Sequence, residues 1–364
     1  MNAGPPPALL LSGPHPRVGG GVVAHCAALQ GALARLGLQV RQVHVGAGRD
    51  EDESLGAKLD GVRALLGGLP TFARQSRGQL VHLNPSFTPK ALLRDAALLL
   101  AARTSGAQTV VEFHGGMPGD VRHPLGALAL RVLCGADAVV VINRLQEKAL
   151  GERFPALRDR LHRIPNGVPL PDLNLTAAVR GRLARPELLF MSRLIPEKGV
   201  LDAVAALAEL PGPVLHVAGE GPARPAAEAL AAELGVADRV VFHGQVSGEA
   251  KAELLRRAAA FVFPTYYPAE GQPIVLLEAF AWGLPVVTCA LAPITDLVPP
   301  ECGRLVPPRD PAAVARGVRE LLASPARYEA AARHNRTLAE YEYDLDRVAR
   351  RFVQLYRQVQ WRRA

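Results

Sequence analysis

Residues 264–287 read PTYYPAEGQPIVLLEAFAWGLPVV, and the interpretation of the whole chain starts from this stretch. The pattern predicts a strand that ends in a loop holding Glu270, and then a helix that Pro273 opens at its first position. Glu278 lies inside that helix between apolar neighbours, where a carboxylate is costly unless it faces a polar ligand or a partner. The stretch therefore predicts a strand–loop–helix unit with a ligand site at its loop.

Short apolar or β-branched runs alternate with stretches of helical period, such as 22–36 and 89–103, along most of the chain. This alternation favours α/β architecture with parallel, doubly wound sheets. The predicted strands are 8–13, 39–45, 80–83, 109–113 and 138–143 in the first half, and 188–193, 214–218, 240–243, 260–264 and 285–289 in the second.

The segment 164–185 interrupts this alternation, because prolines and glycines crowd its start. We therefore expect two Rossmann-like domains, residues 1–168 and 175–344, joined near 166–171. The last stretch, 340–363, has one long helical pattern with an apolar face.

The composition describes a soluble globular chain of 364 residues, with 49% hydrophobic and 21% charged residues. No apolar run approaches the length that spans a bilayer, and the N-terminus lacks the positive charge of a signal peptide. We therefore expect a cytoplasmic protein. The four cysteines form no CxxC pair and are expected to be free, buried thiols. The ten histidines show no HExxH or similar spacing, so we expect no metal site.

Three further loops at predicted strand ends contain residues that suit an anionic or polar ligand. Gly20 and Gly21 belong to a glycine run that lets backbone N–H groups approach a phosphate, although a plain turn is an equal alternative. This run is not GxGxxG, and no acidic residue ends the second strand, which argues against a dinucleotide cofactor. His114 follows a strand in EFHGG, where it faces a cleft or is a hydrogen-bonded loop histidine. Arg193 and Lys198 flank one loop, so they either converge on an anion or belong to an exposed charged loop.

Taken together, these motifs carry a resemblance to a known family. Glu270 and Glu278 form an E-x7-E pair, and R…EKG, GEGP, FHG and IPNGV accompany it at 193–199, 219–222, 242–244 and 164–168. The chain resembles the retaining glycosyltransferases of family 4, closely over 188–308 and loosely before that. The resemblance implies the GT-B fold, in which two Rossmann-like domains face a central cleft with their parallel sheets. It also implies a C-terminal helix, about 345–364, that crosses back to the N-terminal, acceptor-side domain.

The resemblance implies a role for each residue that matches a family motif. Glu270 would hold hydroxyls of the donor sugar, Glu278 the nucleotide ribose, and Arg193 and Lys198 the diphosphate. His114 would contact the sugar near the reacting carbon. The other donor-binding residues would be Gly20, Gly21, Gly244, Gln245, Gly271, Gln272, Pro273 and Ile274. Gln272 and Pro273 replace the Phe and second Gly of the common motif, and the proline removes a backbone donor, which leaves the donor open.

The implied function is the transfer of a hexose-type sugar from a nucleotide-diphosphate sugar to a glycan or lipid-linked acceptor, with retention of anomeric configuration and without metal or cofactor. Two D-x-D patterns, 50–52 and 344–346, would hold metal in another glycosyltransferase fold, but neither follows a predicted strand. Two alternatives stay open: a nucleotide-sugar epimerase or hydrolase of the same fold, and a non-catalytic sugar-nucleotide-binding subunit.

The formal net charge is +8, and basic residues gather at Arg74, Arg77, Lys90, Arg94 and Arg103 and again along the C-terminal helix. This charge predicts peripheral contact with an anionic membrane at its cytoplasmic face. A solvated, arginine-rich surface is an equal alternative. Nucleic-acid binding is not expected, because no nucleic-acid motif or interleaving of aromatic and basic residues accompanies the charge.

Overall fold

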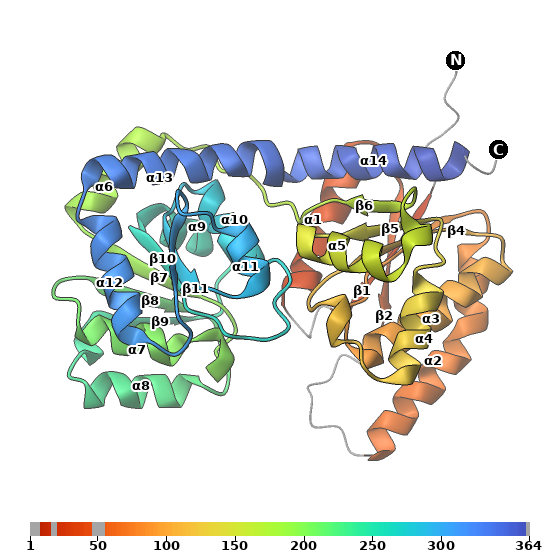
Figure 1. Ribbon diagram of the computed structural model, residues 1–364, viewed down its shortest axis with the longest axis horizontal. Coiled ribbons are helices and arrows are strands. Elements are labelled where there is room, and N and C mark those ends of the chain that lie inside the picture. Colours follow the sequence, from red (N-terminus) through yellow and green to blue (C-terminus); the bar gives the residue numbers. More distant parts are fainter. Residues whose placement is uncertain (1–7, 16–19, 46–54, 362–364) are drawn as a thin grey trace. The chain divides into compact units, whose positions relative to one another are not determined.

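The computed structural model describes residues 8–15, 20–45 and 55–361, which divide into two compact units. Unit 1 consists of Met1–Gly167 and Leu345–Ala364, and unit 2 of Val168–Asp344. The chain passes between the units at Gly167 and again at Asp344. Each unit is an α/β domain with its own six-stranded parallel sheet and its own core, as the alternating pattern predicts (Figure 1).

Unit 1 has the strand order β2-β1-β3-β4-β5-β6, and every pair is parallel. Its strands are β1 (Leu9–Pro14), β2 (Val40–Val45), β3 (Leu80–Leu83), β4 (Gln108–Phe113), β5 (Ala138–Val141) and β6 (Leu161–Arg163). Its helices are α1 (Gly21–Arg35), α2 (Leu55–Ser76), α3 (Pro89–Thr104), α4 (Pro124–Leu133), α5 (Arg144–Arg153) and α14 (Leu345–Trp361).

Unit 2 has the strand order β12-β11-β10-β7-β8-β9, again all parallel. Its strands are β7 (Glu187–Met191), β8 (Val214–Ala218), β9 (Val240–Gly244), β10 (Ala260–Phe263), β11 (Val286–Cys289) and β12 (Gly303–Val306). Its helices are α6 (Leu175–Ala184), α7 (Val200–Ala208), α8 (Arg224–Glu233), α9 (Gly248–Arg257), α10 (Ile274–Ala281), α11 (Ala292–Leu297), α12 (Pro311–Leu322) and α13 (Pro325–Leu338).

The C-terminal helix α14 belongs to unit 1, although it is the last element of the chain. Leu345, Val348, Phe352 and Leu355 recur with helical spacing, and all are buried in one cluster with residues of α1, β4 and β5. This packing follows from the apolar face that the sequence predicts.

The prediction of one continuous helix over 340–363 is wrong. A π-helical turn, Ala339–Tyr343, comes first, and Asp344 then takes a non-helical backbone conformation with ψ 121°. Val168 N–H donates to the Tyr343 carbonyl at 2.8 Å, so the chain is held in an extended bridge at this point. The helix resumes at Leu345 because its apolar face then has a core to pack against.

Three other expectations also need correction. Pro273 is not the first residue of its helix: with ψ 112° it is the N-cap, and α10 begins at Ile274. The predicted strand 138–143 ends at Val141, because Asn143 caps α5 by accepting from Gln146 N–H at 2.8 Å. Strands β6 and β12 have no counterpart in the prediction, since they are three and four residues long and only partly buried.

Candidate functional site

The sheet of unit 2 changes winding direction between β7 and β10, and parallel sheets bind ligands outside the carboxyl ends of the strands at such a point. Lys198 lies in the loop after β7, and Glu270 lies in the loop after β10. The two side chains meet: Lys198 Nζ donates to Glu270 Oε1, and Thr265 Oγ1 donates to the same oxygen at 3.1 Å. Both charged groups are buried, so this ion pair is part of the ordered interior at the switch point, the place where the winding direction of the sheet reverses.

Aromatic rings complete the surroundings of the Lys198 ammonium. Its nitrogen lies 4.5 Å from the centre of the Tyr267 ring and 5.6 Å from that of Phe263. Such rings attract a cation through their negative faces. An ammonium has three donors, and the contact with Glu270 uses one of them. The arrangement therefore holds a buried cation ready to donate to an anionic ligand.

Glycines bring the neighbouring loops into close contact at this edge of the sheet. Gly199 has φ +82°, and a Cβ there would lie 2.2 Å from the Pro264 carbonyl oxygen. Gly219, in the GEGP motif after β8, has φ +136°, and a Cβ would lie 1.8 Å from the Ser192 carbonyl oxygen. Only glycine fits both positions, so the loop after β7 is fixed against the loops on either side of it.

Glu278, a carboxylate in an apolar segment, is paired with a lysine. From α10 it accepts a hydrogen bond at Oε1 from Lys251 Nζ of α9, at 2.5 Å. Its other oxygen, Oε2, is buried without a hydrogen-bond partner among the described residues. Burial raises the pKa of Glu278, and the charge of Lys251 opposes that rise. The free oxygen is an acceptor for a ligand, and Lys251 is a site residue that sequence reasoning missed.

The remaining predicted residues of unit 2 line the same loops without joining the ion pair. Arg193 is exposed, and its side chain makes no hydrogen bond or ion pair within the described part of the chain. The structure therefore does not pair Arg193 with Glu270 as it pairs Lys198. Gly271 and Pro273 are buried, Gln272 and Ile274 are partly buried, and Gly244 and Gln245 lie at the carboxyl end of β9.

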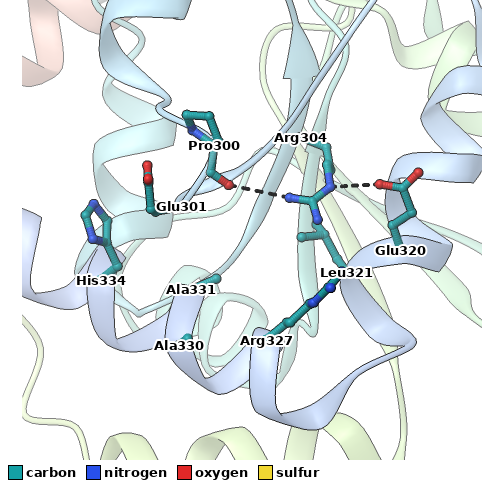
Figure 2. Close-up of a pocket in the computed structure, with 9 residues that line it drawn as sticks. All are labelled: Pro300, Glu301, Arg304, Glu320, Leu321, Arg327, Ala330, Ala331 and His334. Carbon is teal, nitrogen blue, oxygen red and sulfur yellow. Dashed lines mark hydrogen bonds and ion pairs between the residues drawn. The ribbon is translucent and has the colours of Figure 1, made fainter.

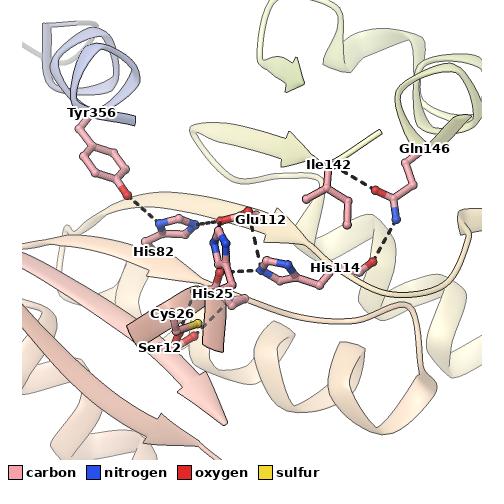
Figure 3. A network of polar contacts seen from close by, with 10 residues as sticks. Ser12, His25, Cys26, His82, Glu112, His114, Ile142, Gln146 and Tyr356 are labelled. Carbon is pink, nitrogen blue, oxygen red and sulfur yellow. Dashed lines mark hydrogen bonds and ion pairs between the residues drawn. The ribbon is translucent and has the colours of Figure 1, made fainter. Parts of the chain in front are cut away.

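In unit 1, polar side chains gather around Glu112, near the carboxyl end of β4 (Figure 3). Its oxygens lie 3.3 Å from His25 Nε2, 3.1 Å from His82 Nε2 and 3.8 Å from His114 Nε2. We call Glu112 and these three histidines the Glu112 cluster. All four side chains are buried. Of the four, sequence reasoning had assigned a site role only to His114.

The charges in the Glu112 cluster are set by burial and by close neighbours. Burial favours the neutral form of Glu112, but His25, together with the hydrogen bonds from His25 and His82, outweighs it and holds the pKa of Glu112 well below the usual value of a glutamate. Burial also lowers the pKa of His114 to about 3. Glu112 is therefore a carboxylate and His114 a neutral imidazole at neutral pH.

The main chain around His114 is held on both sides. Its N–H donates to the Pro85 carbonyl at 2.9 Å, and its carbonyl accepts from Gln146 Nε2 at 3.0 Å. Gln146 also donates to the Gly116 carbonyl at 2.9 Å and accepts from Ile142 N–H at 3.2 Å. This buried amide ties the loop to the start of α5, so His114 is presented from a fixed backbone.

Gly20 and Gly21 start helix α1, at the carboxyl end of β1. Gly20 is the N-cap and has φ +94°, a conformation that favours glycine, and Gly21 is the first helical residue. Gly19, the first member of the glycine run, lies outside the described residues. The backbone N–H groups of the first turn of a helix have no intrahelical partner, so this helix start suits an anion.

His25, Glu112 and His114 are also the group of described residues that could hold a metal ion, since one ligand atom from each lies within 4.8 Å of the others. A carboxylate with two imidazoles is a donor set that zinc accepts. Here, however, His114 Nε2 lies 2.9 Å from Asn84 Oδ1 as well as facing Glu112. The Asn84 oxygen accepts a hydrogen bond and therefore needs a proton on that nitrogen, whereas a metal needs the proton removed. The cluster therefore fits hydrogen bonding better than metal binding.

A surface hollow of unit 2 is lined by none of the residues described above (Figure 2). Arg304 spans it, pairing with Glu320 at 2.9 Å and donating to the Pro300 carbonyl at 3.4 Å. Pro300 and Glu301 precede β12, so the hollow lies by the amino end of that strand, opposite to the edge where parallel sheets bind ligands. We assign no part of the candidate site to it.

Sequence comparison adds family models to this geometry. The model "Glycosyl transferases group 1" matches residues 178–338, and "Glycosyltransferase Family 4" matches residues 19–171. The chain is 34% identical over 266 residues to a D-inositol 3-phosphate glycosyltransferase of Xylanimonas cellulosilytica. That match covers 68% of this chain and 63% of the relative.

Solved structures show the same fold. Sucrose-phosphate synthase from Thermosynechococcus elongatus superimposes with a TM-score of 0.78 at 24% identity, over 97% of this chain and 99% of that one. Anabaena HepE, solved with UDP and glucose, gives a TM-score of 0.72 at 17% identity, over 95% and 98% of the two chains.

Proposed function

We propose that this chain, which belongs to the GT-B glycosyltransferases of the family 4 type, transfers a hexose-type sugar from a nucleotide-diphosphate sugar to a glycan or lipid-linked acceptor. The observation that carries the proposal is the buried Lys198–Glu270 pair at the switch point of unit 2. It supplies one cation for a diphosphate and one carboxylate for sugar hydroxyls, side by side.

Lys198, Glu270 and Glu278 would each bind a different part of the donor. Lys198 would donate to the diphosphate and stabilise the negative charge that develops as the nucleoside diphosphate leaves. Glu270 would accept hydrogen bonds from hydroxyls of the sugar. Glu278, through the oxygen that Lys251 leaves free, would accept from the ribose. Arg193 offers a second, exposed cation on the same loop as Lys198.

We propose that transfer retains the anomeric configuration by front-face attack, with an oxygen of the leaving phosphate taking the proton of the acceptor hydroxyl. The bond from the anomeric carbon to the phosphate oxygen breaks as the bond to the acceptor oxygen forms. Side chains then bind and orient, and none acts as a nucleophile. The charge stabilisation comes from Lys198 and Arg193, so no metal ion is required.

The experiment is turnover with a panel of nucleotide-diphosphate sugars and acceptors, starting with UDP-glucose because UDP and glucose are bound in HepE. Release of nucleoside diphosphate and the anomeric configuration of the product are followed by NMR. We expect acceptor-dependent release with retention, loss of it in Glu270→Gln, and normal turnover in Glu329→Gln, a partly exposed carboxylate of α13. Inversion at the anomeric carbon would contradict the proposed mechanism. Conversion of the donor without dependence on an acceptor would favour the epimerase or hydrolase instead.

We further propose that unit 1 contacts an anionic membrane through helices α2, α3 and α4, which pack side by side (Figure 1). Each helix exposes a pair of large apolar side chains: Val62 and Leu66, Leu93 and Leu100, and Leu125 and Leu128. The same helices carry the exposed cations Arg74, Lys90, Arg103 and Arg131. Apolar side chains among cations suit the surface of an anionic bilayer.

Among the described residues, no helix is both long and apolar enough to cross a membrane. Co-sedimentation with vesicles therefore tests surface binding. We expect salt-sensitive binding to anionic vesicles, weakened in a Leu100→Ser/Leu128→Ser variant. Equal binding to anionic and neutral vesicles would contradict this proposal.

A further inference from the structure

Arg182, on α6 of unit 2, is a buried cation whose hydrogen-bond partners are backbone carbonyls. Its Nε donates to the Arg256 carbonyl at 3.0 Å. Its Nη2 donates to the Leu255 carbonyl at 3.3 Å and to the Trp282 carbonyl at 3.0 Å. Arg182 is only 2% exposed, and within the described part of the chain no carboxylate pairs with it. The backbone therefore has to stabilise this buried charge.

The three carbonyls belong to the carboxyl ends of two helices. Leu255 and Arg256 lie in the last turn of α9, and Trp282 is the C-cap of α10. Such a helix end carries about half a negative charge, so the two ends together offset about one guanidinium charge. The Arg256 guanidinium also lies over the Trp282 ring, 5.6 Å from its centre. Arg182 therefore joins the carboxyl end of α9 to that of α10.

The same two helices carry the Lys251–Glu278 pair. Lys251 lies four residues before Leu255 on α9, and α6 packs against this helix. Glu278 lies four residues before Trp282 on α10, which packs against α13. Four residues are about one helical turn, or ~6 Å along the helix axis. The bonds of Arg182 thus fix both helices one turn away from the point where Lys251 Nζ meets Glu278 Oε1.

We infer that Arg182 is a positioning residue of the nucleotide site, which holds α9 and α10 so that Lys251 reaches one oxygen of Glu278 and leaves the other for a ligand. The ligand, a nucleoside diphosphate, rests on the proposed function, but the placement of the ion pair is a property of the free protein. If α9 moves away from α10, Glu278 loses its cation, and a buried carboxyl group without a cation favours its neutral form. A neutral carboxyl group accepts a hydrogen bond less strongly than a carboxylate does.

The placement is tested without ligand by ¹³C NMR of the glutamate-labelled full chain, with Glu278→Gln to assign the Glu278 carboxyl signal. Lys251 is the charged group that opposes the effect of burial on this carboxyl group. We expect the pH midpoint of the signal to rise by at least about one pH unit in Lys251→Met, and to rise in Arg182→Met as well. A midpoint in Arg182→Met equal to that of the wild type would overturn the inference.

Arg239→Met is the matched control, because Arg239 also donates to three backbone carbonyls of unit 2, but at and beyond the end of α7. It should destabilise unit 2 and leave the Glu278 midpoint unchanged. If Arg182→Met does not fold, Arg182→Lys decides, because it keeps the cation but lacks the planar fork that reaches both helix ends. Its midpoint should rise by a smaller amount, and a midpoint equal to that of the wild type would overturn the inference.

The effect on binding is tested by calorimetric titration of UDP and GDP into the same variants. We expect Arg182→Met and Lys251→Met each to weaken binding of the preferred diphosphate about tenfold, as for one lost hydrogen bond. The double variant should bind no more weakly than either single variant, because both substitutions act through Glu278. Arg239→Met should bind as the wild type does.

Additive losses in the double variant, or wild-type affinity in Arg182→Met, would overturn the inference. If the wild type binds neither diphosphate, the proposed function fails, whereas the ¹³C midpoints still decide whether Arg182 places the Lys251–Glu278 pair.

Discussion

Replacing Lys198 by alanine is expected to destabilise unit 2 strongly, in addition to any effect on activity. The Lys198 and Glu270 side chains are only 10% and 9% exposed. Alanine leaves the Glu270 carboxylate buried without its cation, which costs about 3–5 kcal/mol. In a unit of this size each kcal/mol lowers Tm by about 2–4 °C, so the melting of unit 2 should fall by about 6–20 °C.

Thermal and urea denaturation followed by circular dichroism measure this loss. Lys148→Ala is the control, because its side chain is 75% exposed and its pair with Glu152 lies on the surface, so its effect should stay within about 0.5 kcal/mol. The double variant Lys198→Met/Glu270→Leu removes both charges and should recover most of the stability. A Lys198→Ala protein as stable as the control would refute the burial of the pair.

Three further predictions follow from the loops, the thiols and the assigned charges. Gly199→Ala should lower the free energy of unfolding by about 1–3 kcal/mol, because Gly199 has φ +82° and a Cβ there would clash with the Pro264 carbonyl. Gly181→Ala, where a Cβ on α6 would meet open space, should raise it by about 0.5–1 kcal/mol. Equal effects of the two substitutions in urea denaturation would contradict the loop geometry. The four buried cysteines should resist iodoacetamide at pH 8 and react in denaturant, because burial raises the pKa of three of them to about 12 and that of Cys26 further. Rapid labelling of the native protein, followed by mass spectrometry, would contradict that burial. Sugar transfer should continue in excess EDTA, and a loss of turnover restored by Mn²⁺ or Mg²⁺ would show that Arg193 and Lys198 do not suffice.

The sequence predicts most of this fold because long apolar runs and helical periods dominate it. Ten of the twelve strands coincide with predicted runs to within one or two residues. The two that were missed, β6 and β12, are edge strands whose short, half-exposed sequences carry little apolar signal. The break at Asp344 was missed because the apolar spacing is helical on both sides of it.

The site was predictable only where its residues stand close together in the sequence. Glu270 and Glu278 share one strand–loop–helix motif, and Lys198 belongs to another. Lys251 and Asn84 escaped notice, because an isolated polar residue shows no spacing that marks it. The Glu112 cluster was missed for a similar reason: its members come from β3, β4, α1 and the loop after β4, and only the order of the strands in the sheet brings them together.

The most direct test of the central claim is calorimetric titration of UDP, GDP and NAD into the wild type, Glu278→Gln and Glu329→Gln, all in EDTA. We predict that one nucleoside diphosphate binds the wild type and Glu329→Gln equally well and Glu278→Gln at least about tenfold more weakly, because the buried carboxylate no longer accepts from the ribose. NAD should not bind. Binding of NAD in place of both diphosphates, or diphosphate binding that Glu278→Gln leaves intact, would contradict the assignment of this edge of unit 2 as a sugar-nucleotide site.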